Sequence, residues 1–242
     1  MSLVLDQNGT GYRFSMEPFL LADFVRPEAG SRCLEVGTGC SIIPLLLLTR
    51  QPKLLFRAIE IQESLIQKAQ SNLADNNALD RVQLVHADFL EWSLAHLNET
   101  FDWVISNPPY RKLNSGRINP DREKALARHE ITLTLESLVS RAEKHLNPGG
   151  KLCLAYPTER LEEVKQVLVS NGLQPVKVRK VFGNESLPAR FFLILAERNL
   201  EEANCEEDRF FIYEKNGSYT SAMKSIYESF NYPGRSHRYR EE

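Results

Sequence analysis

The 242-residue sequence lacks the features that mark membrane, secreted or metal-rich proteins. Its longest apolar run, residues 42–48, is interrupted by Pro44 and is too short to span a membrane. The first ten residues have no basic segment followed by an apolar core, so no secretory signal is predicted. The four cysteines form no Cys-x-x-Cys pair, and we expect reduced, mostly buried thiols in a cytoplasmic protein. A net charge of −2 neither requires nor excludes nucleic acid, because local charge governs that binding.

What the sequence does contain is an alternation of short apolar runs and helical stretches. Five apolar runs have the length of strands: 32–36, 54–61, 81–86, 101–106 and 150–156. The stretches between them are mostly helical, most clearly over 63–77, where apolar residues recur on one face. Strands that alternate with helices predict a parallel, doubly wound α/β sheet.

The alternation changes near the end of the sequence. Two further strands are predicted at 175–182 and 190–197, with seven residues between them. Because a parallel crossover usually needs a dozen or more residues, these strands should form an antiparallel hairpin. Residues 200–208 are acidic and polar, which favours a surface loop, and 219–230 has the pattern of an amphipathic helix.

We therefore expect one domain over residues 1–242, with a seven-stranded sheet that is parallel except for one strand and is flanked by helices. This layout resembles that of class I methyltransferases. Residues 199–242 would form a C-terminal extension, and the last nine residues are expected to be a mobile tail.

A glycine-containing turn, Glu35-Val36-Gly37-Thr38-Gly39-Cys40-Ser41, follows the first predicted strand and leads into a helix. Glycines in such a turn allow close approach of a ligand to the backbone, although they are also common for structural reasons. The dinucleotide pattern G-x-G-x-x-G is broken by Ile42. The acidic-x-G-x-G-x-G pattern of S-adenosylmethionine sites fits better, with Ser41 in place of its last glycine. We predict that Glu35, Gly37, Gly39 and Ser41 bind this cofactor.

Two more acidic residues close the next predicted strands. Glu60 lies 21 residues after Gly39, where a carboxylate can accept hydrogen bonds from both ribose hydroxyls. Asp88 is a candidate acceptor for the adenine amino group, with Phe89 packed on the ring, and is equally suited to cap the following helix. Because the carboxyl ends of parallel strands meet at one edge, these residues should lie near the glycine turn.

The fourth predicted strand ends in Asn107-Pro108-Pro109-Tyr110. Two prolines fix the backbone and lack amide donors, which predicts a rigid turn. An amino nitrogen conjugated to a ring or carbonyl is a poor nucleophile, because its lone pair is delocalised. The Asn107 side chain and the Pro108 carbonyl can accept from its two N–H groups and turn the lone pair toward a methyl donor, while Tyr110 stacks on the flat group. This turn predicts methylation of a planar amino group.

No metal is needed for this chemistry, and none is expected. Five histidines show no ligand spacing and are expected at the surface or at helix ends: His86, His96, His129, His145 and His237.

Six segments together resemble the bacterial tRNA1(Val) adenine-N6-methyltransferases: FSMEPFLLADFV (14–25), CLEVGTGCSIIPLLLLTR (33–50), AIEIQESL (58–65), ISNPPY (105–110), ARHEITLTLESLV (127–139) and FIYEKNGSYT (211–220). The resemblance implies a class I fold, S-adenosylmethionine as methyl donor, and methylation of the adenine just 3′ of the anticodon in valine tRNA. By the family's motifs, Gly37, Gly39, Glu60 and Asp88 would bind the cofactor, and residues 107–110 would hold the base. The N-terminal segment 1–30 would cover the cofactor.

Basic residues gather near the predicted base-binding turn. Residues 111–128 contain six basic and two acidic residues, and 174–198 contain five basic and two acidic residues. We predict tRNA phosphate contacts for Arg111, Lys112, Arg117 and Arg190.

Three other functions remain open from the sequence. Release-factor glutamine N5-methyltransferases use the same turn on a planar amide, but they carry a helical domain ahead of the cofactor domain, and about thirty residues precede Cys33 here. Methylation of guanine N2 in ribosomal RNA shares the fold, the turn and a basic surface. A non-catalytic RNA-binding protein with an altered cofactor loop has only Ser41 in its favour.

Overall fold

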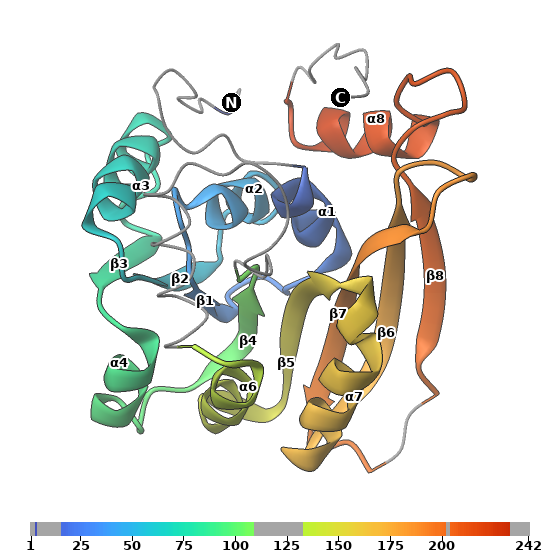
Figure 1. Ribbon diagram of the computed structural model, residues 1–242. Helices are drawn as coiled ribbons and strands as arrows, with labels where there is room; N and C mark the ends of the chain where they lie inside the picture. The colour runs from blue at the N-terminus through green and yellow to red at the C-terminus, as the bar shows by residue number, and fades with distance from the viewer. Residues whose placement is uncertain (1–2, 4–15, 109–132, 202–203, 233–242) are drawn as a thin grey trace.

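The computed structural model describes residues 3, 16–108, 133–201 and 204–232, and these contain one sheet with the strand order β3-β2-β1-β4-β5-β7-β6-β8 (Figure 1). The strands are β1 (Arg32–Val36), β2 (Leu55–Glu60), β3 (Val82–His86), β4 (Phe101–Ser106), β5 (Leu146–Pro157), β6 (Leu173–Phe182), β7 (Ala189–Arg198) and β8 (Glu206–Phe211). The helices are α1 (Glu17–Phe24), α2 (Ile42–Arg50), α3 (Glu63–Asp75), α4 (Phe89–Ala95), α6 (Leu135–Lys144), η1 (Thr158–Arg160), α7 (Leu161–Ser170) and α8 (Ser221–Ser229).

Strands β1 to β5 are parallel, and β7 lies antiparallel between β5 and β6. Strand β6 therefore points the same way as β1 to β5, and so does β8, which pairs with it in parallel. The carboxyl ends of every described strand except β7 face one edge of the sheet, which we call the carboxyl edge. The predicted α/β class, its mostly parallel sheet and the β6–β7 hairpin are confirmed. Chain order reverses between β1 and β4, and ligands of open α/β sheets bind at such a point.

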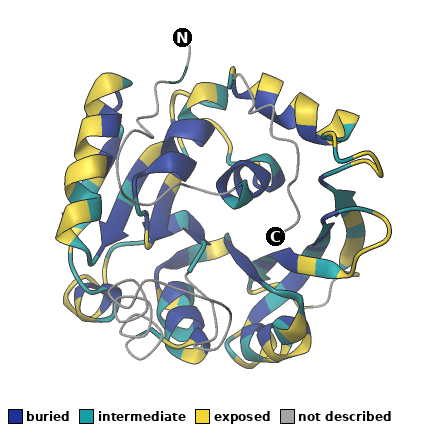
Figure 2. Cartoon of the chain, turned by 45° about the horizontal axis from the view of Figure 1, so that its top comes forward, coloured by how far each residue is buried: buried dark blue, intermediate teal, exposed yellow. Residues whose placement is uncertain are grey.

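The sheet is buried on both faces. Helices α1, α2, α3 and α8 pack on one face, and α4, α6 and α7 pack on the other. Successive β1 residues alternate between these layers, so that Cys33 belongs to one apolar cluster and Leu34 to the other. Figure 2 shows buried strands between helices whose outer surfaces are exposed. Two-sided burial explains why the predicted strands were nearly continuous apolar runs.

Local sequence also sets where the helices begin. Residues 42–47 of α2 are all buried, and Pro44 lies in its first turn, where its missing amide costs nothing. Helices α6 and α8 begin after threonines whose hydroxyls accept from a backbone N–H: Thr134 from Ser137, and Thr220 from Met223, both at 3.2 Å. The predicted final helix is thereby confirmed, with α8 inside the expected range.

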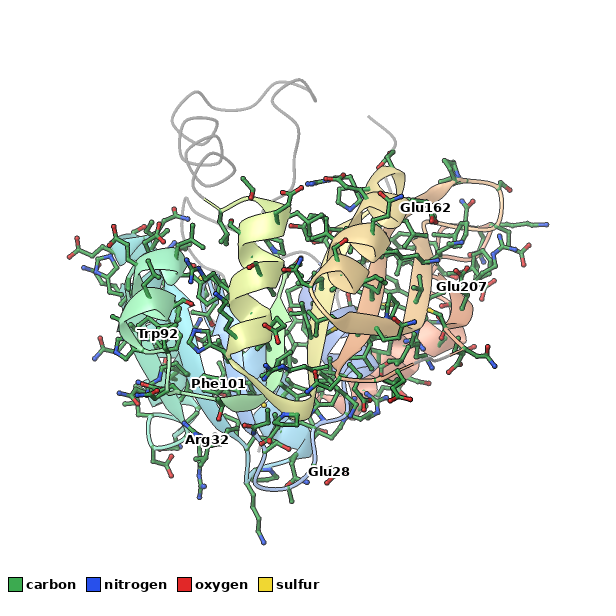
Figure 3. All side chains as sticks on the ribbon, turned by 90° about the horizontal axis from the view of Figure 1, so that it is seen from below. Glu28, Arg32, Trp92, Phe101, Glu162 and Glu207 are labelled. Carbon is green, nitrogen blue, oxygen red and sulfur yellow. The ribbon has the colours of Figure 1, made fainter. Side chains whose placement is uncertain are left out.

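The prediction of seven strands is wrong, and that of a loop over 200–208 is wrong from Glu206 onward, because Glu206 begins the edge strand β8. The acidic residues at the beginning of β8 form ion pairs with basic residues of the neighbouring strand β6. Four ion pairs join them: Lys177–Glu206 at 3.0 Å, Lys177–Asp208 at 4.0 Å, Arg179–Asp208 at 2.8 Å and Lys180–Glu207 at 2.9 Å. Glu207, labelled in Figure 3, also pairs with Lys165 of α7 at 2.9 Å.

The Asp208→Asn substitution should lower the free energy of unfolding by about 1–2 kcal/mol. Asp208 accepts from both Nε and Nη2 of Arg179, whose side chain is only 17% exposed and also contacts Asp23 at 3.2 Å. Urea unfolding measures the change. The matched control is Glu206→Gln, because Glu206 is 64% exposed and its pair should contribute under about 0.5 kcal/mol. Equal effects of the two substitutions would contradict the assigned role of Asp208.

His145 lies at the C-terminal end of α6, one of the two places expected for the histidines, and it is fully buried. Its Nδ1 donates to the Glu99 carbonyl at 2.8 Å, and its Nε2 lies 2.8 Å from the Ser93 hydroxyl. Burial lowers its pKa below the usual value. Its ring packs 5.1 Å from that of Trp92, which Figure 3 labels beside Phe101. His145 therefore joins α4, β4 and β5 as a core residue.

The prediction of free, mostly buried thiols is confirmed, because all four cysteines are free and three of them are buried: Cys33, Cys40 and Cys153. Among the described residues no helix has the length and apolarity that a membrane crossing requires.

Candidate active site

The glycine turn lies at the carboxyl edge, between β1 and α2. Its two glycines take positive φ angles, 74° at Gly37 and 57° at Gly39, a conformation that glycine adopts without strain. The N–H groups of Gly37 and Thr38 both donate to the Ile59 carbonyl, at 2.9 and 3.0 Å, which ties the turn to the end of β2. A Cβ atom added to either glycine would meet no atom of the described residues within 4 Å. The turn therefore faces open space with its backbone exposed to a ligand.

Glu60 connects the turns after β1 and β2. Its Oε2 accepts from the Gly39 N–H, and its Oε1 accepts from the Gln62 N–H, both at 2.9 Å. The residue is only 3% exposed. An ionised carboxylate offers about four acceptor positions, so two remain after these bonds. Glu60 therefore orders the glycine turn and keeps the capacity to accept from a ligand's hydroxyl groups.

Behind the turn lies a buried chain of three polar side chains. The Thr38 hydroxyl donates to a carboxyl oxygen of Glu35 and lies 3.1 Å from the Ser41 hydroxyl. All three residues are at most 6% exposed. Ser41 has φ 58°, the left-handed conformation for which glycine is usual, and its hydroxyl lies on the buried side of the turn beside Thr38. The contacts that the sequence predicts between Glu35 or Ser41 and a cofactor remain predictions.

The end of β4 brings Asn107 beside the glycine turn. Ser106 is paired with Val36 in the β1–β4 register, and its hydroxyl donates to the Val36 carbonyl at 2.8 Å. Asn107 follows Ser106 just as Gly37 follows Val36, so Asn107 and Gly37 leave neighbouring strands at the same level. Asn107 and Pro108 are half-buried. Pro109 and Tyr110 lie outside the described residues, as do the predicted RNA contacts Arg111, Lys112 and Arg117.

Asp88 caps the helix that follows β3. Its Oδ1 accepts from the N–H groups of Leu90 at 2.7 Å and Glu91 at 3.4 Å. This is the capping role that the sequence left open, and both of these bonds use the same one of its two carboxyl oxygens. Phe89 is 5% exposed and stacks near Trp92, with ring centroids 6.4 Å apart, so its ring belongs to the apolar core. The adenine contacts predicted for Asp88 and Phe89 stay predictions.

Comparison with known proteins identifies the family. The family model described as "Methyltransferase small domain" matches residues 17–180. Two tRNA1(Val) (adenine(37)-N6)-methyltransferases of Porphyromonas gingivalis, from strains W83 and ATCC 33277, are 36% and 38% identical to this chain. Each match covers 72% of this chain and 71% of the relative. The chain belongs to this methyltransferase family.

The fold agrees with that membership. The crystal structure of a predicted O-methyltransferase, Atu636 of Agrobacterium tumefaciens, superposes with a TM-score of 0.71 at 18% identity. The match covers 91% of this chain and 99% of that one. At this level of identity the likeness shows a common fold, the class I methyltransferase fold that the sequence led us to expect.

S-adenosylmethionine is accordingly the cofactor of this methyltransferase, and the residues at the carboxyl edge fit it. The open space in front of Gly37 and Gly39 admits a ligand against bare backbone. Glu60 offers acceptors of the kind that ribose hydroxyls require. When bound, the cofactor supplies a methyl group on positively charged sulfur. Among the described residues, no group of three or more His, Cys, Asp or Glu side chains is arranged to hold a metal ion.

Three residues that support this methyltransferase site were missed by the sequence reasoning. Thr38 binds Glu35 beneath the glycine turn, and Ser106 joins β4 to β1. Asn72 of α3 is 4% exposed and donates from Nδ2 to the Cys40 carbonyl at 3.0 Å, which ties the turn to α3. Only Asn72 carried a signal, because it follows Ala69 by three positions on the apolar face of its helix.

The basic residues of 174–198 are largely paired. Lys177, Arg179 and Lys180 bind the acidic residues of β8, and Arg198 binds Glu143 at 2.7 Å. Arg190 differs, because its side chain is exposed and forms no ion pair with any described residue. Of the five basic residues in 174–198, Arg190 is the one without an ion pair to a described residue, so its charge can bind a phosphate.

Glu35 gives the methyltransferase a measurable dependence of stability on pH. Burial raises the pKa of Glu35 to about 8, from an ordinary value near 4.5; the hydrogen bond from Thr38 opposes the shift and the charge of Glu60 adds to it. The folded protein therefore keeps this carboxyl protonated at pH values where the unfolded chain releases the proton. The stabilising contribution is complete below about pH 4.5 and is lost as the pH rises to about 8.

The Glu35→Gln variant should not lose this contribution, because a glutamine amide does not titrate. The difference between its free energy of unfolding and that of the wild type should rise by up to about 1.4 kcal/mol per pH unit between pH 5 and 8. Urea unfolding at a series of pH values measures the difference. Glu28→Gln, a substitution of the same kind at an exposed position labelled in Figure 3, is the control and should show a constant difference. A constant difference for Glu35→Gln would refute the assignment.

Proposed function

We propose that this protein transfers a methyl group from S-adenosylmethionine to N6 of adenine 37, next to the anticodon of tRNA1(Val), in the cytoplasm. Its relatives of that name support the substrate. The observation that carries the proposal is the position of Asn107, which begins the Asn-Pro-Pro-Tyr turn beside Gly37 at the point where strand order reverses. Methylation of a planar amino group requires acceptors at that place.

In the proposed mechanism, the residues that follow β4 hold the amino group of adenine for methyl transfer. The Asn107 side-chain oxygen and the Pro108 carbonyl accept from the two N6–H groups of adenine, which directs the nitrogen lone pair toward the methyl carbon. The N6–C bond forms as the carbon–sulfur bond breaks, and N6 then releases one proton. Adenine 37 lies in a single-stranded loop, so its extrusion needs little unpairing.

Other parts of the chain have proposed roles in holding the substrates. Glu35, Gly37, Gly39, Ser41, Glu60, Asp88 and Phe89 are the proposed cofactor-binding residues, with residues 1–30 as the segment that covers the cofactor. Tyr110 would stack on the base. Arg111, Lys112, Arg117 and Arg190 would contact phosphates.

The decisive experiment offers the purified protein and labelled S-adenosylmethionine to tRNA, ribosomal RNA and release factor in parallel. Transfer to tRNA alone, with N6-methyladenosine at position 37 by mass spectrometry, is the expected result. Transfer to ribosomal RNA at guanine N2, or to a glutamine of the release factor, would replace the proposal with the corresponding alternative. Nucleosides from cells that lack the gene should show loss of the same modification.

A further inference from the structure

A group of aromatic and basic side chains lies at the carboxyl edge, away from the glycine turn. Phe182 ends β6 and Phe211 ends β8; they are paired in register, with ring centroids 5.2 Å apart. The Arg209 guanidinium lies over both rings, 4.5 Å from the Phe182 centroid and 5.1 Å from the Phe211 centroid. Arg190 lies beside Gly183, directly after Phe182. We call Phe182, Arg190, Arg209 and Phe211 the β6–β8 patch.

The two arginines of the patch carry positive charge that no carboxylate of the described residues neutralises. Arg190 and Arg209 are exposed and form no ion pair with any described residue. The basic residues of β6, the strand between β7 and β8, do form ion pairs: Lys177, Arg179 and Lys180 all bind carboxylates of β8. A guanidinium held against aromatic rings keeps its charge and its N–H donors, and these can bind a phosphate in pairs. The contrast marks the patch as a surface for a charged partner.

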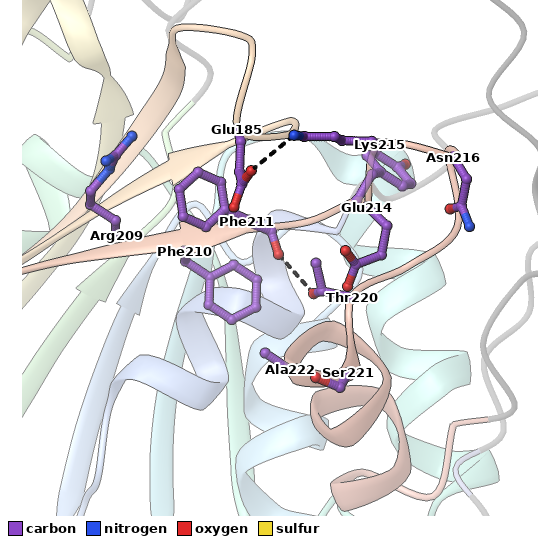
Figure 4. Close-up of a pocket in the computed structure, with 11 residues that line it drawn as sticks. Glu185, Arg209, Phe210, Phe211, Glu214, Lys215, Asn216, Thr220, Ser221 and Ala222 are labelled. Carbon is purple, nitrogen blue, oxygen red and sulfur yellow. Dashed lines mark hydrogen bonds and ion pairs between the residues drawn. The ribbon is translucent and has the colours of Figure 1, made fainter.

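A hollow of about 710 Å³ adjoins the patch where β8 leads into α8 (Figure 4). Its walls include Arg209, Phe210, Phe211 and Tyr213, with Glu185 and Lys215 joined by an ion pair of 3.8 Å. Glu214 also lines it. These carboxylates would repel a phosphate but accept hydrogen bonds from the amino groups of a base. Aromatic walls with such acceptors suit a nucleobase, and the arginines beside them suit its phosphates.

The patch lies at a useful distance from the turn after β4. Strands β6 and β8 are three and four places from β4 in the sheet, and their carboxyl ends face the same edge as Asn107. At about 4.8 Å per strand the separation is about 14–19 Å. This equals roughly four to six stacked nucleotides at about 3.4 Å each. One stretch of RNA can therefore reach both places.

We infer that the β6–β8 patch and its hollow form a second RNA-binding site, which takes a single-stranded nucleotide of the substrate a few positions away from the methylated base. The inference rests on the proposed function and adds to it the place where the rest of the anticodon loop is held. Arg190 and Arg209 bind phosphates there, and a base packs against the half-buried aromatic side chains of the patch and the hollow.

The test measures tRNA affinity by fluorescence anisotropy over a range of salt concentrations, with steady-state methylation kinetics beside it. Arg209→Ala should weaken tRNA binding about tenfold and make the slope of log K against log salt less steep by about 0.7–0.9. Phe211→Leu keeps an apolar side chain but removes the flat face, so it should weaken binding about tenfold with no change in slope. Both variants should raise KM for tRNA and leave kcat and the affinity for S-adenosylmethionine unchanged.

Lys53→Ala is the matched control, because Lys53 is exposed at the opposite edge of the sheet, just before β2. The inference is overturned if Arg209→Ala alters tRNA affinity and slope no more than Lys53→Ala does. If Phe211→Leu lowers the melting temperature, Arg190→Ala takes its place beside Arg209→Ala and should reduce the slope equally. If the wild-type protein methylates tRNA and the patch variants bind tRNA as tightly as the wild type does, this inference is refuted and the proposed function stands. A wild-type protein that methylates no tRNA removes the proposed function and this inference with it.

Discussion

Asn107→Ala should lower kcat for methyl transfer by about a thousandfold and leave the affinity for S-adenosylmethionine within about threefold. The side-chain oxygen of Asn107 is proposed to hold one N–H of the reacting amino group, and loss of one such preorganised hydrogen bond typically costs about a hundredfold to a thousandfold in rate. The proposed cofactor contacts lie on other turns, at Gly37, Gly39 and Glu60, which hydrogen bonds within the protein hold in place. Labelled methyl transfer gives kcat, and calorimetry gives the cofactor affinity.

Two further variants sharpen this test. Asn107→Asp keeps an acceptor oxygen at the same place, so it should retain more activity than Asn107→Ala. Asn171→Ala makes the same chemical change at the end of α7, where the amide donates to the Val167 carbonyl at 2.8 Å, and should leave kcat unchanged. Equal losses of kcat and cofactor affinity in Asn107→Ala would mean that Asn107 supports the cofactor site rather than the amino group.

Most of the sheet could be predicted because its strands are buried on both faces. Runs such as 101–106 are apolar almost throughout, and the structure places β4 at those same residues. Strand β8 begins Glu-Glu-Asp, which has the composition of a loop. Its strand conformation depends on Lys177, Arg179 and Lys180, about thirty residues earlier, and that pairing is not visible in the local sequence.

The candidate site could be predicted where a motif carries its own geometry. Gly37 and Gly39 require positive φ, and Glu60 follows at the spacing of a strand–helix–strand unit, so both were expected at the carboxyl edge. Ser106 and Asn72 act only because the fold brings them to the Val36 and Cys40 carbonyls. Such supporting contacts join distant segments, so a single sequence gives little sign of them.

Glu60→Ala should lower the affinity for S-adenosylmethionine by at least about a hundredfold. Two charge-assisted hydrogen bonds to ribose hydroxyls would be lost, each worth about 1.5–3 kcal/mol, and about 1.4 kcal/mol corresponds to a factor of ten. The Gly39 N–H would lose its acceptor as well, so the glycine turn would lose order and the melting temperature should fall. Calorimetry well below the melting temperature separates the loss of binding from the loss of fold.

Glu60→Gln discriminates between the two duties of this carboxylate. The Gly39 N–H and the Gln62 N–H bind different oxygens of the Glu60 carboxylate. In the same position a glutamine keeps only one of these oxygens, and its NH2 group must face the other donor. We expect its cofactor affinity to lie between those of the wild type and Glu60→Ala. Glu63→Gln removes the same charge from an exposed position three residues further along the chain. Its affinity for S-adenosylmethionine should equal that of the wild type. Wild-type affinity in Glu60→Gln would show that the glycine turn needs neither the charge nor the second oxygen, and the ribose contact would then have to be sought elsewhere on the carboxyl edge.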